Sequence, residues 1–237
     1  MYKRSKDSAY GKTSWREQME DVEWAVRHTR EVFKQGDVPV FLYGQSMGGG
    51  LALALATRPS APPAQEAVGL LSGVIASSPL VTQTKPASKV ARWIGGRASM
   101  FSPNMNIPAE INPEHLSRDP EVGKATLKDP LIKQIGSIRG ISDMLDGGEQ
   151  LLAKDYERWP PGLPLLVVHG TEDQVTSPRA SEEFFNKVPA EDKTYIPFEG
   201  AYHEVHNEIQ NTREQLVEAC ISWVERHLEQ KPVESML

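Results

Sequence analysis

The stretch VFLYGQSMGGGLALALATRP, residues 40–59, decides the fold of this chain. It starts with an apolar run typical of a buried β-strand and ends with a Leu- and Ala-rich run typical of a helix packed on a sheet. The pentapeptide between them, GQSMG at 44–48, fits the pattern G-x-S-x-G in the strand–turn–helix context that this pattern requires. We expect a strained turn whose glycines leave room where no Cβ atom fits, and which exposes Ser46 at a helix N-terminus. There the N–H of Met47 can stabilise a developing oxyanion, whereas the alternative is an incidental serine in a small-residue helix.

Further strands and helices alternate along the chain. Apolar runs predict three more buried strands, at 69–79, 163–170 and 193–200. Helical patterns follow Ser46 and also cover about 14–36, 177–188 and 207–228. This alternation predicts an α/β fold with a mostly parallel sheet and helices on both faces.

Several local patterns fix details of these elements. Ser14 and Glu17 form a capping box, and the helix that follows has an apolar face made of Met19, Val22, Val26 and Phe33. The run VPVFLY at 38–43 predicts a strand covered on both faces. Pro197 indicates that the last strand has an exposed or irregular side.

The interval from about Leu80 to Trp159 interrupts the alternation. It is rich in Pro, Gly, Ser and Asn, and its helical patterns are short. A segment of this length is better explained as an insertion than as a plain loop. We therefore expect one domain over residues 1–237, with an inserted cap at about 80–152.

A serine becomes a strong nucleophile only when a histidine takes its proton and a carboxylate orients that histidine. Asp173, in HGTEDQVTSP, follows the third strand at the carboxyl edge where parallel sheets build their sites, and Glu172 is its alternative. His203, in EGAYHEVHNE, follows the fourth strand at the same edge, and His206 is its alternative. These positions predict a Ser46–His203–Asp173 triad.

The four remaining histidines fit structural positions better. His28 and His227 lie in predicted helices, and His115 lies in the predicted cap. His169 closes a strand, which is typical of a structural hydrogen-bonding residue. The HEVH sequence at 203–206 lacks the H-E-x-x-H spacing of a zinc site, and we expect no metal or cofactor.

Charge and composition narrow the classes of function. The net charge is -6 and the sequence pI is about 5.6, so the average surface repels nucleic acid. No run of 18 apolar residues predicts a membrane span, and no apolar segment of a secretion signal follows the basic N-terminus. The only cysteine, Cys220, is expected to be a buried, inert thiol, which favours a cytoplasmic location.

The motifs resemble those of the monoacylglycerol lipases, an α/β-hydrolase family of the serine aminopeptidase S33-like, hydrolase-4 type. The resemblance covers about 11–228 and rests on VFLYGQSMGGG, SSPL, LSRDPEV, DPLI, HGTEDQVTSP and FEGAYHEVHNE. It implies that Ser46 is the nucleophile, Asp173 the acid and His203 the base. Family members usually have His where this chain has Gln45.

The resemblance implies hydrolysis of monoacylglycerol to fatty acid and glycerol through an acyl-enzyme. The cap would hold the acyl chain, and five apolar residues would form its mouth or, equally, core contacts of the cap: Val90, Trp93, Ile94, Met100 and Phe101. An apolar mouth would bring the protein into peripheral contact with a membrane or lipid droplet. The alternatives are a lysophospholipase, a general carboxylesterase, or an impaired hydrolase that acts only as a binding protein.

One departure from the family concerns the start of the chain. Family members begin with additional strands and a His-Gly segment that supplies a second oxyanion N–H, and the sequence before KDSAYGKTS, at 6–14, holds no counterpart. The resemblance therefore predicts an N-terminally truncated fold in which 38–43 forms an open sheet edge. Loss of one oxyanion donor typically lowers kcat by about 100- to 1000-fold.

Overall fold

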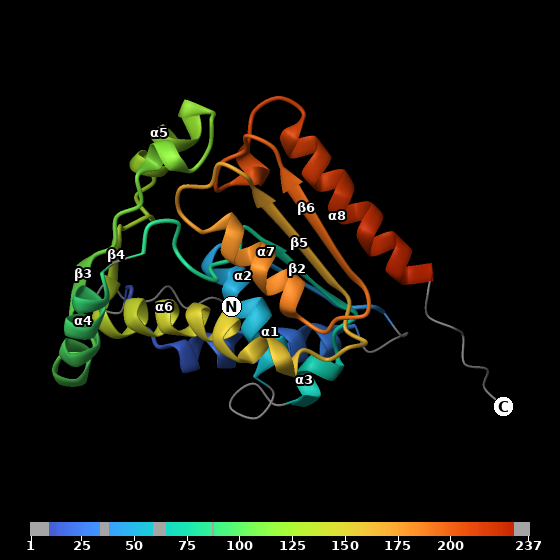
Figure 1. The fold of residues 1–237 in the computed structure, drawn as a ribbon, viewed down its shortest axis with the longest axis horizontal. Coiled ribbons are helices and arrows are strands. Elements are labelled where there is room, and N and C mark those ends of the chain that lie inside the picture. Colours follow the sequence, from blue (N-terminus) through green and yellow to red (C-terminus); the bar gives the residue numbers. More distant parts are fainter. Residues whose placement is uncertain (1–9, 34–37, 59–64, 87, 230–237) are drawn as a thin grey trace.

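A computed structural model describes residues 10–33, 38–58, 65–86 and 88–229 of the chain (Figure 1). Its centre is a four-stranded sheet in the order β1-β2-β5-β6. The strands are Phe41–Gln45, Gly73–Ser77, Leu165–Gly170 and Lys193–Phe198. All three pairings are parallel, which confirms the predicted α/β class. A separate antiparallel pair joins β3, Asn106–Pro108, to β4, Ile135–Ser137.

Helices cover both faces of the central sheet (Figure 1). One face carries α1 (Trp15–Val32), α2 (Met47–Thr57), α6 (Ile138–Ala153) and α7 (Pro178–Lys187). The opposite face carries α8 (Thr212–Glu229). The shorter α3 spans Gln65–Gly69, and α4 (Lys89–Phe101) and α5 (Pro120–Lys128) lie between β2 and β5 along the chain.

The sheet separates two hydrophobic cores because successive strand side chains point to opposite faces. Side chains facing the α1, α2, α6 and α7 layer include Val74, Ala76, Leu165 and Val167. Side chains facing α8 include Ile75, Leu166 and Val168, which pack with Leu216 and Trp223. Strands β2 and β5 are buried along their whole length, as expected for central strands covered on both faces.

The first strand differs from its prediction. It begins at Phe41, and both Val38 and Tyr43 are exposed, Tyr43 by 47%. In the described part of the chain, β1 pairs only with β2, so Tyr43 stands at an open edge of the sheet. The expectation that 38–43 is covered on both faces is therefore wrong. The opposite edge strand, β6, carries the exposed Pro197, as its sequence indicates.

The ends of the first and last helices correct two further predictions. The Ser14 hydroxyl caps α1 by accepting the N–H of Glu17 at 3.3 Å, as predicted. Phe33, however, is the C-cap residue and is 53% exposed, so it does not belong to the buried face of the helix. The predicted end near Gly36 lies outside the described residues. Residues 205–207 form the short 3-10 helix η4, so α8 starts at Thr212.

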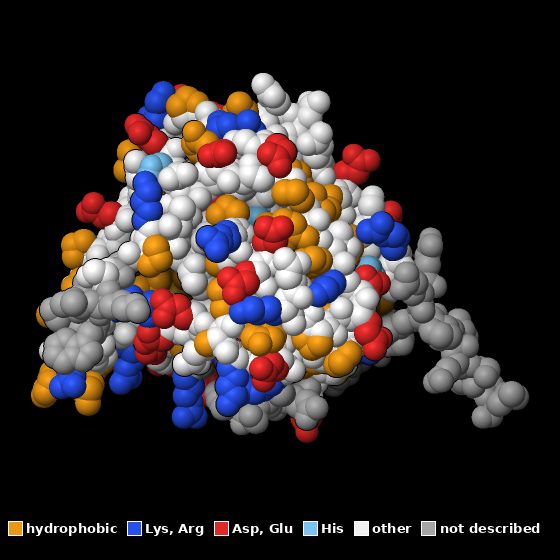
Figure 2. All heavy atoms as spheres, in the orientation of Figure 1, with side chains coloured by type: hydrophobic (Ala, Val, Ile, Leu, Met, Phe, Trp, Pro, Cys, Tyr) orange, Lys and Arg blue, Asp and Glu red, His pale blue; other side chains and the backbone are white. Residues whose placement is uncertain are grey.

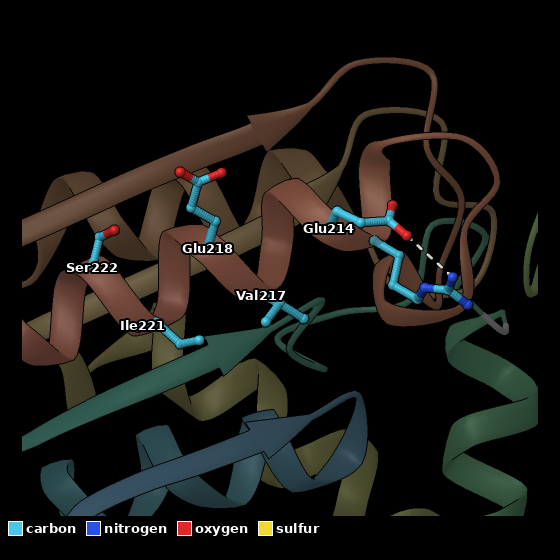
Figure 3. Close-up of a pocket in the computed structure, with 6 residues that line it drawn as sticks. Glu214, Val217, Glu218, Ile221 and Ser222 are labelled. Carbon is cyan, nitrogen blue, oxygen red and sulfur yellow. Dashed lines mark hydrogen bonds and ion pairs between the residues drawn. The ribbon is translucent and has the colours of Figure 1, made fainter.

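The outer surface of α8 carries a shallow groove of about 390 Å³ (Figure 3). Val217 and Ile221, each about half exposed, give it an apolar floor. All of its lining residues belong to α8, so the groove is separate from the Ser46 loop. Cys220 on the same helix is only partly buried, but this burial raises the pKa of its thiol and so reduces its thiolate fraction at neutral pH.

The segment between β2 and β5 includes α4, β3, α5, β4 and α6, with the 3-10 helix η2 at Pro113–His115. Within it, α6 belongs partly to the main core, since its Leu151 is fully buried there. Hydrophobic side chains gather at the left end of the molecule in Figure 2, where α4 lies. Met100 and Phe101, at the end of α4, are 78% and 86% exposed, so they are not core contacts. The side chains of Val90, Trp93 and Ile94 lie outside those that the structure describes.

Candidate active site

Ser46 occupies the turn between β1 and α2. Its backbone has φ 55° and ψ -122°, a region that side-chain-bearing residues rarely adopt, at a cost of roughly 1–3 kcal/mol. The turn is held because the Ser46 N–H donates to the Ser77 carbonyl at 3.0 Å. In return, the Ser46 carbonyl accepts from Gly50 at 3.0 Å and from Leu80 at 2.9 Å. These bonds join the turn to the end of β2.

Glycines make this turn possible, but not at every position. A Cβ atom on Gly44 would lie 2.2 Å from the carbonyl oxygen of Gly48, and one on Gly50 would lie 2.7 Å from that of Leu80. A Cβ atom on Gly48, in contrast, would meet nothing within 4 Å. The expectation that the motif's glycines avoid Cβ clashes therefore holds for Gly44 and is wrong for Gly48.

The structure brings the three side chains of the predicted triad into one hydrogen-bonded chain. Ser46 Oγ lies 2.9 Å from His203 Nε2, and His203 Nδ1 lies 2.8 Å from Asp173 Oδ2. Asp173 and His203 are almost fully buried, at 1% and 2% exposure. Because the carboxylate accepts at Nδ1–H, the Nε2 lone pair is free to take a proton from the hydroxyl.

The Asp173 carboxylate is surrounded by donors. Its Oδ1 accepts the N–H groups of Val175 and Thr176 at 2.7 and 3.0 Å. Its Oδ2 accepts from the Thr176 hydroxyl at 2.8 Å, and from His203 and His169. Burial alone would raise the pKa of Asp173, but the hydrogen bonds from the two histidines outweigh it and hold this pKa well below its ordinary value. The group is therefore ionised at neutral pH.

The alternative acid and base lie elsewhere. Glu172 is exposed, and its backbone N–H donates to the Ala201 carbonyl at 3.0 Å. His206 lies on η4, and its buried Nδ1 has no hydrogen-bond partner among the described residues. His28, His115 and His227 lie on α1, η2 and α8, as predicted for helical and inserted positions.

Two groups next to the triad give it further contacts. The side-chain amide nitrogen of Gln45 lies 3.3 Å from His203 Nε2, the same ring nitrogen that Ser46 contacts. Met47 is the first residue of α2, and the first N–H groups of a helix have no partner within the helix. The arrangement therefore combines a serine hydroxyl, an oriented base and an N–H group of the kind that stabilises an oxyanion.

A partly buried ion pair, which we did not predict, supports the loop that carries His203. Glu208 is buried and accepts from Arg118 Nε at 2.9 Å and from the N–H of Tyr202 at 2.7 Å. The N–H of Glu204 also donates to the Leu116 carbonyl, at 2.7 Å. The only sequence signal is that LSRDPEV and FEGAYHEVHNE both carry the family resemblance. Because Arg118 and Glu208 are 90 residues apart, no local sequence pattern predicts their contact.

Across the described ranges, no three His, Cys, Asp or Glu side chains converge in a way that could hold a metal ion. The side chains of Ser46, His203 and Asp173 lie in one hydrogen-bonded chain. They fit nucleophilic acyl transfer, in which a base activates a serine and an N–H group stabilises the tetrahedral oxygen.

Comparison with known proteins gives a family match over most of the chain. The model of Hydrolase_4, described as serine aminopeptidase S33, matches residues 4–210. This range includes Ser46, Asp173 and His203.

Curated relatives and solved structures agree with this match. The monoacylglycerol lipase of Mycolicibacterium smegmatis is 30% identical over 81% of this chain and 64% of its own length. The crystal structure of the Paleococcus ferrophilus monoacylglycerol lipase superposes with a TM-score of 0.78 at 27% identity, over 92% of this chain and 77% of that one. A soluble variant of the Saccharomyces cerevisiae monoglyceride lipase, solved with a substrate analogue, superposes with a TM-score of 0.84 at 24% identity. This match covers 94% of this chain and 73% of that one. The chain spans between 50% and 67% of the length of curated relatives from Schizosaccharomyces pombe and Saccharomyces cerevisiae.

Proposed function

Since this chain belongs to the Hydrolase_4 family, described as serine aminopeptidase S33, we propose that it is a serine ester hydrolase that cleaves monoacylglycerol into fatty acid and glycerol. The observation that carries this proposal is the chain of hydrogen bonds from Ser46 through His203 to Asp173, at 2.9 and 2.8 Å. The relatives named as monoacylglycerol lipases support the choice of substrate.

In the first half of the reaction, Ser46 Oγ attacks the ester carbonyl carbon while His203 Nε2 takes the hydroxyl proton. The carbonyl oxygen becomes an oxyanion, which the N–H of Met47 at the start of α2 stabilises. When the intermediate collapses, the C–O bond to glycerol breaks and His203 returns its proton to the glycerol oxygen. The acyl group stays on Ser46 as an ester.

In the second half, a water molecule replaces glycerol. His203 Nε2 takes a proton from this water, and the resulting hydroxide attacks the acyl carbon. Collapse of the second intermediate breaks the bond to Ser46 Oγ, which recovers its proton from His203. The products are a fatty acid and the free enzyme.

Asp173 supports both halves by keeping His203 in one tautomer. Its Oδ2 accepts the Nδ1–H at 2.8 Å, which leaves Nε2 free to accept a proton. The imidazolium formed in each step is stabilised by the adjacent carboxylate. The low pKa of Asp173 keeps that carboxylate charged over the pH range in which imidazole acts as a base.

A substrate panel tests this function. We expect the purified chain to give a higher kcat/KM with a long-chain monoacylglycerol than with lysophosphatidylcholine or a short p-nitrophenyl ester. An aminoacyl naphthylamide tests the activity that the family description names. Ser46→Ala, which keeps the fold but lacks the nucleophile, is the control for every substrate. A higher kcat/KM with another ester would reassign the substrate class, and folded protein without any ester turnover would contradict the proposal.

We further propose that the protein works in the cytoplasm at the surface of a membrane or lipid droplet, where its lipid substrate resides. No described helix is both long and apolar enough to span a bilayer. The exposed Met100 and Phe101 at the end of α4 support a peripheral contact instead, because apolar side chains in water favour an acyl environment.

Vesicle binding tests this location. We expect Phe101→Ser to reduce co-sedimentation with phosphatidylcholine vesicles that contain monoacylglycerol, by roughly 10- to 150-fold, since burying a large apolar side chain contributes about 1.5–3 kcal/mol. Val217→Ser is the matched control, because Val217 is 50% exposed but lies on α8. Equal losses in both variants, or none in either, would argue against docking through α4.

A further inference from the structure

His169 is a buried histidine that the reaction above does not use. It lies at the end of β5 with no exposed surface. Its Nε2 lies 3.1 Å from Asp173 Oδ2 and 3.3 Å from the carbonyl oxygen of Thr176. The ring therefore contacts the same carboxylate oxygen that His203 contacts from the loop after β6.

The partners of His169 determine where its proton lies. The Thr176 hydroxyl also lies 3.4 Å from Nε2, but it donates to Asp173 Oδ2 at 2.8 Å. The other two partners, a carboxylate oxygen and a carbonyl oxygen, are acceptors, so Nε2 must be the donor. The other nitrogen, Nδ1, is buried and has no hydrogen-bond partner among the described residues. A second proton there would create a buried N–H without an acceptor, which is unfavourable. The geometry thus favours the tautomer with its proton on Nε2.

The hydrogen bond from His169 helps to hold the Asp173 carboxylate in one orientation. Asp173 Oδ2 accepts from two imidazoles, those of His203 and His169. The end of β5 and the loop after β6 also approach closely, since a Cβ atom on Gly170 would lie 2.2 Å from the carbonyl oxygen of Tyr202. A second donor on this oxygen limits rotation of the carboxylate, and so fixes the direction in which it accepts from His203.

We propose that His169 is a positioning residue, which donates from Nε2 to Asp173 and fixes the carboxylate oxygen that orients His203. This inference deepens the proposed function and rests on it. Among the described residues, no hydrogen bond joins His169 to Ser46. His169 acts through Asp173, so its loss is expected to lower kcat and leave KM nearly unchanged.

Nitrogen NMR on the wild-type chain, labelled with ¹⁵N-histidine, tests the tautomer without any substrate. We expect His169 to carry its proton on Nε2 and His203 to carry its proton on Nδ1. A proton found on Nδ1 of His169, or on both of its nitrogens, would overturn the proposal. This result does not depend on whether the chain hydrolyses monoacylglycerol.

Variants test the positioning role. His169→Leu removes the donor, and we expect kcat to fall roughly 10- to 100-fold, because hydrogen bonds to charged groups are among the strong ones. The Nδ1–H proton signal of His203 should shift at the same time. His169→Gln places an amide N–H near the position of Nε2, and it should restore kcat to within about 3-fold of wild type.

His227→Leu is the matched control for loss of a buried histidine. His227 is 9% exposed and contacts Trp223 and Asp192 on the α8 side of the sheet, away from Asp173. We expect this variant to lose stability while keeping kcat and the His203 proton signal. If His169→Leu does not fold, the Gln variant and the wild-type tautomer still decide the matter. The proposal would be overturned if folded His169→Leu and His169→Gln lost kcat equally and the Nδ1–H signal of His203 did not shift. His169 would then have a structural role only.

Discussion

Replacing His203 with alanine is expected to lower kcat for ester hydrolysis by about 10⁴- to 10⁶-fold. The reason is geometric: His203 Nε2 lies 2.9 Å from Ser46 Oγ, and among the described side chains no second histidine contacts this hydroxyl. Without the imidazole, the hydroxyl keeps its proton and remains a weak nucleophile. Steady-state kinetics with a monoacylglycerol or a chromogenic ester measure the effect.

His206→Ala is the matched control for this variant. His206 lies three residues further along the chain, on η4, and among the described residues its Nδ1 has no hydrogen-bond partner. We expect it to keep most of the wild-type kcat, provided that thermal melts show both variants to be folded. The reverse outcome, with His206 essential and His203 dispensable, would reassign the base.

The second large effect is expected from Gly44→Ala. The new Cβ atom would lie 2.2 Å from the carbonyl oxygen of Gly48 and 2.6 Å from its carbon, and both are backbone atoms that cannot rotate away. The start of α2 would have to shift, and the Ser46 turn with it. We expect a loss of about 3 kcal/mol in the free energy of unfolding, measured by urea denaturation, and loss of activity.

Gly48→Ala provides the control within the same motif. Its Cβ atom would meet nothing within 4 Å, and alanine favours the helix over glycine by about 1 kcal/mol. We expect the free energy of unfolding of this variant to equal or exceed that of wild type. If Gly48→Ala destabilised the chain as much as Gly44→Ala, the steric account of the turn would be wrong.

Local patterns predicted much of the fold. The capping box at Ser14, the apolar runs of β2 and β5, and the strand–turn–helix sequence around Ser46 each act within a few residues, so the sequence carries them directly. The approach of Asp173 and His203 was predictable for a related reason. Both follow strands of a parallel sheet, and the carboxyl ends of such strands meet at one edge.

The remaining features depend on contacts between distant segments. Tyr43 looks like a core residue in its apolar run, and an open edge at 38–43 was expected only from the family resemblance, not from this local pattern. The Arg118–Glu208 pair spans 90 residues and has no local pattern. His169 closes a strand as a structural histidine would, and the sequence does not reveal that its ring faces Asp173. Side-chain direction at a strand end depends on the whole packed sheet.

The most direct test of the central claim is active-site labelling with a fluorophosphonate. This reagent forms a covalent bond with a serine that an adjacent base has activated, whichever ester the enzyme prefers. Mass spectrometry of the folded chain should find one label on Ser46, with none on Ser46→Ala and a strongly slowed reaction on His203→Ala. Folded wild-type protein that stays unlabelled, or that carries the label on another side chain, would contradict the account.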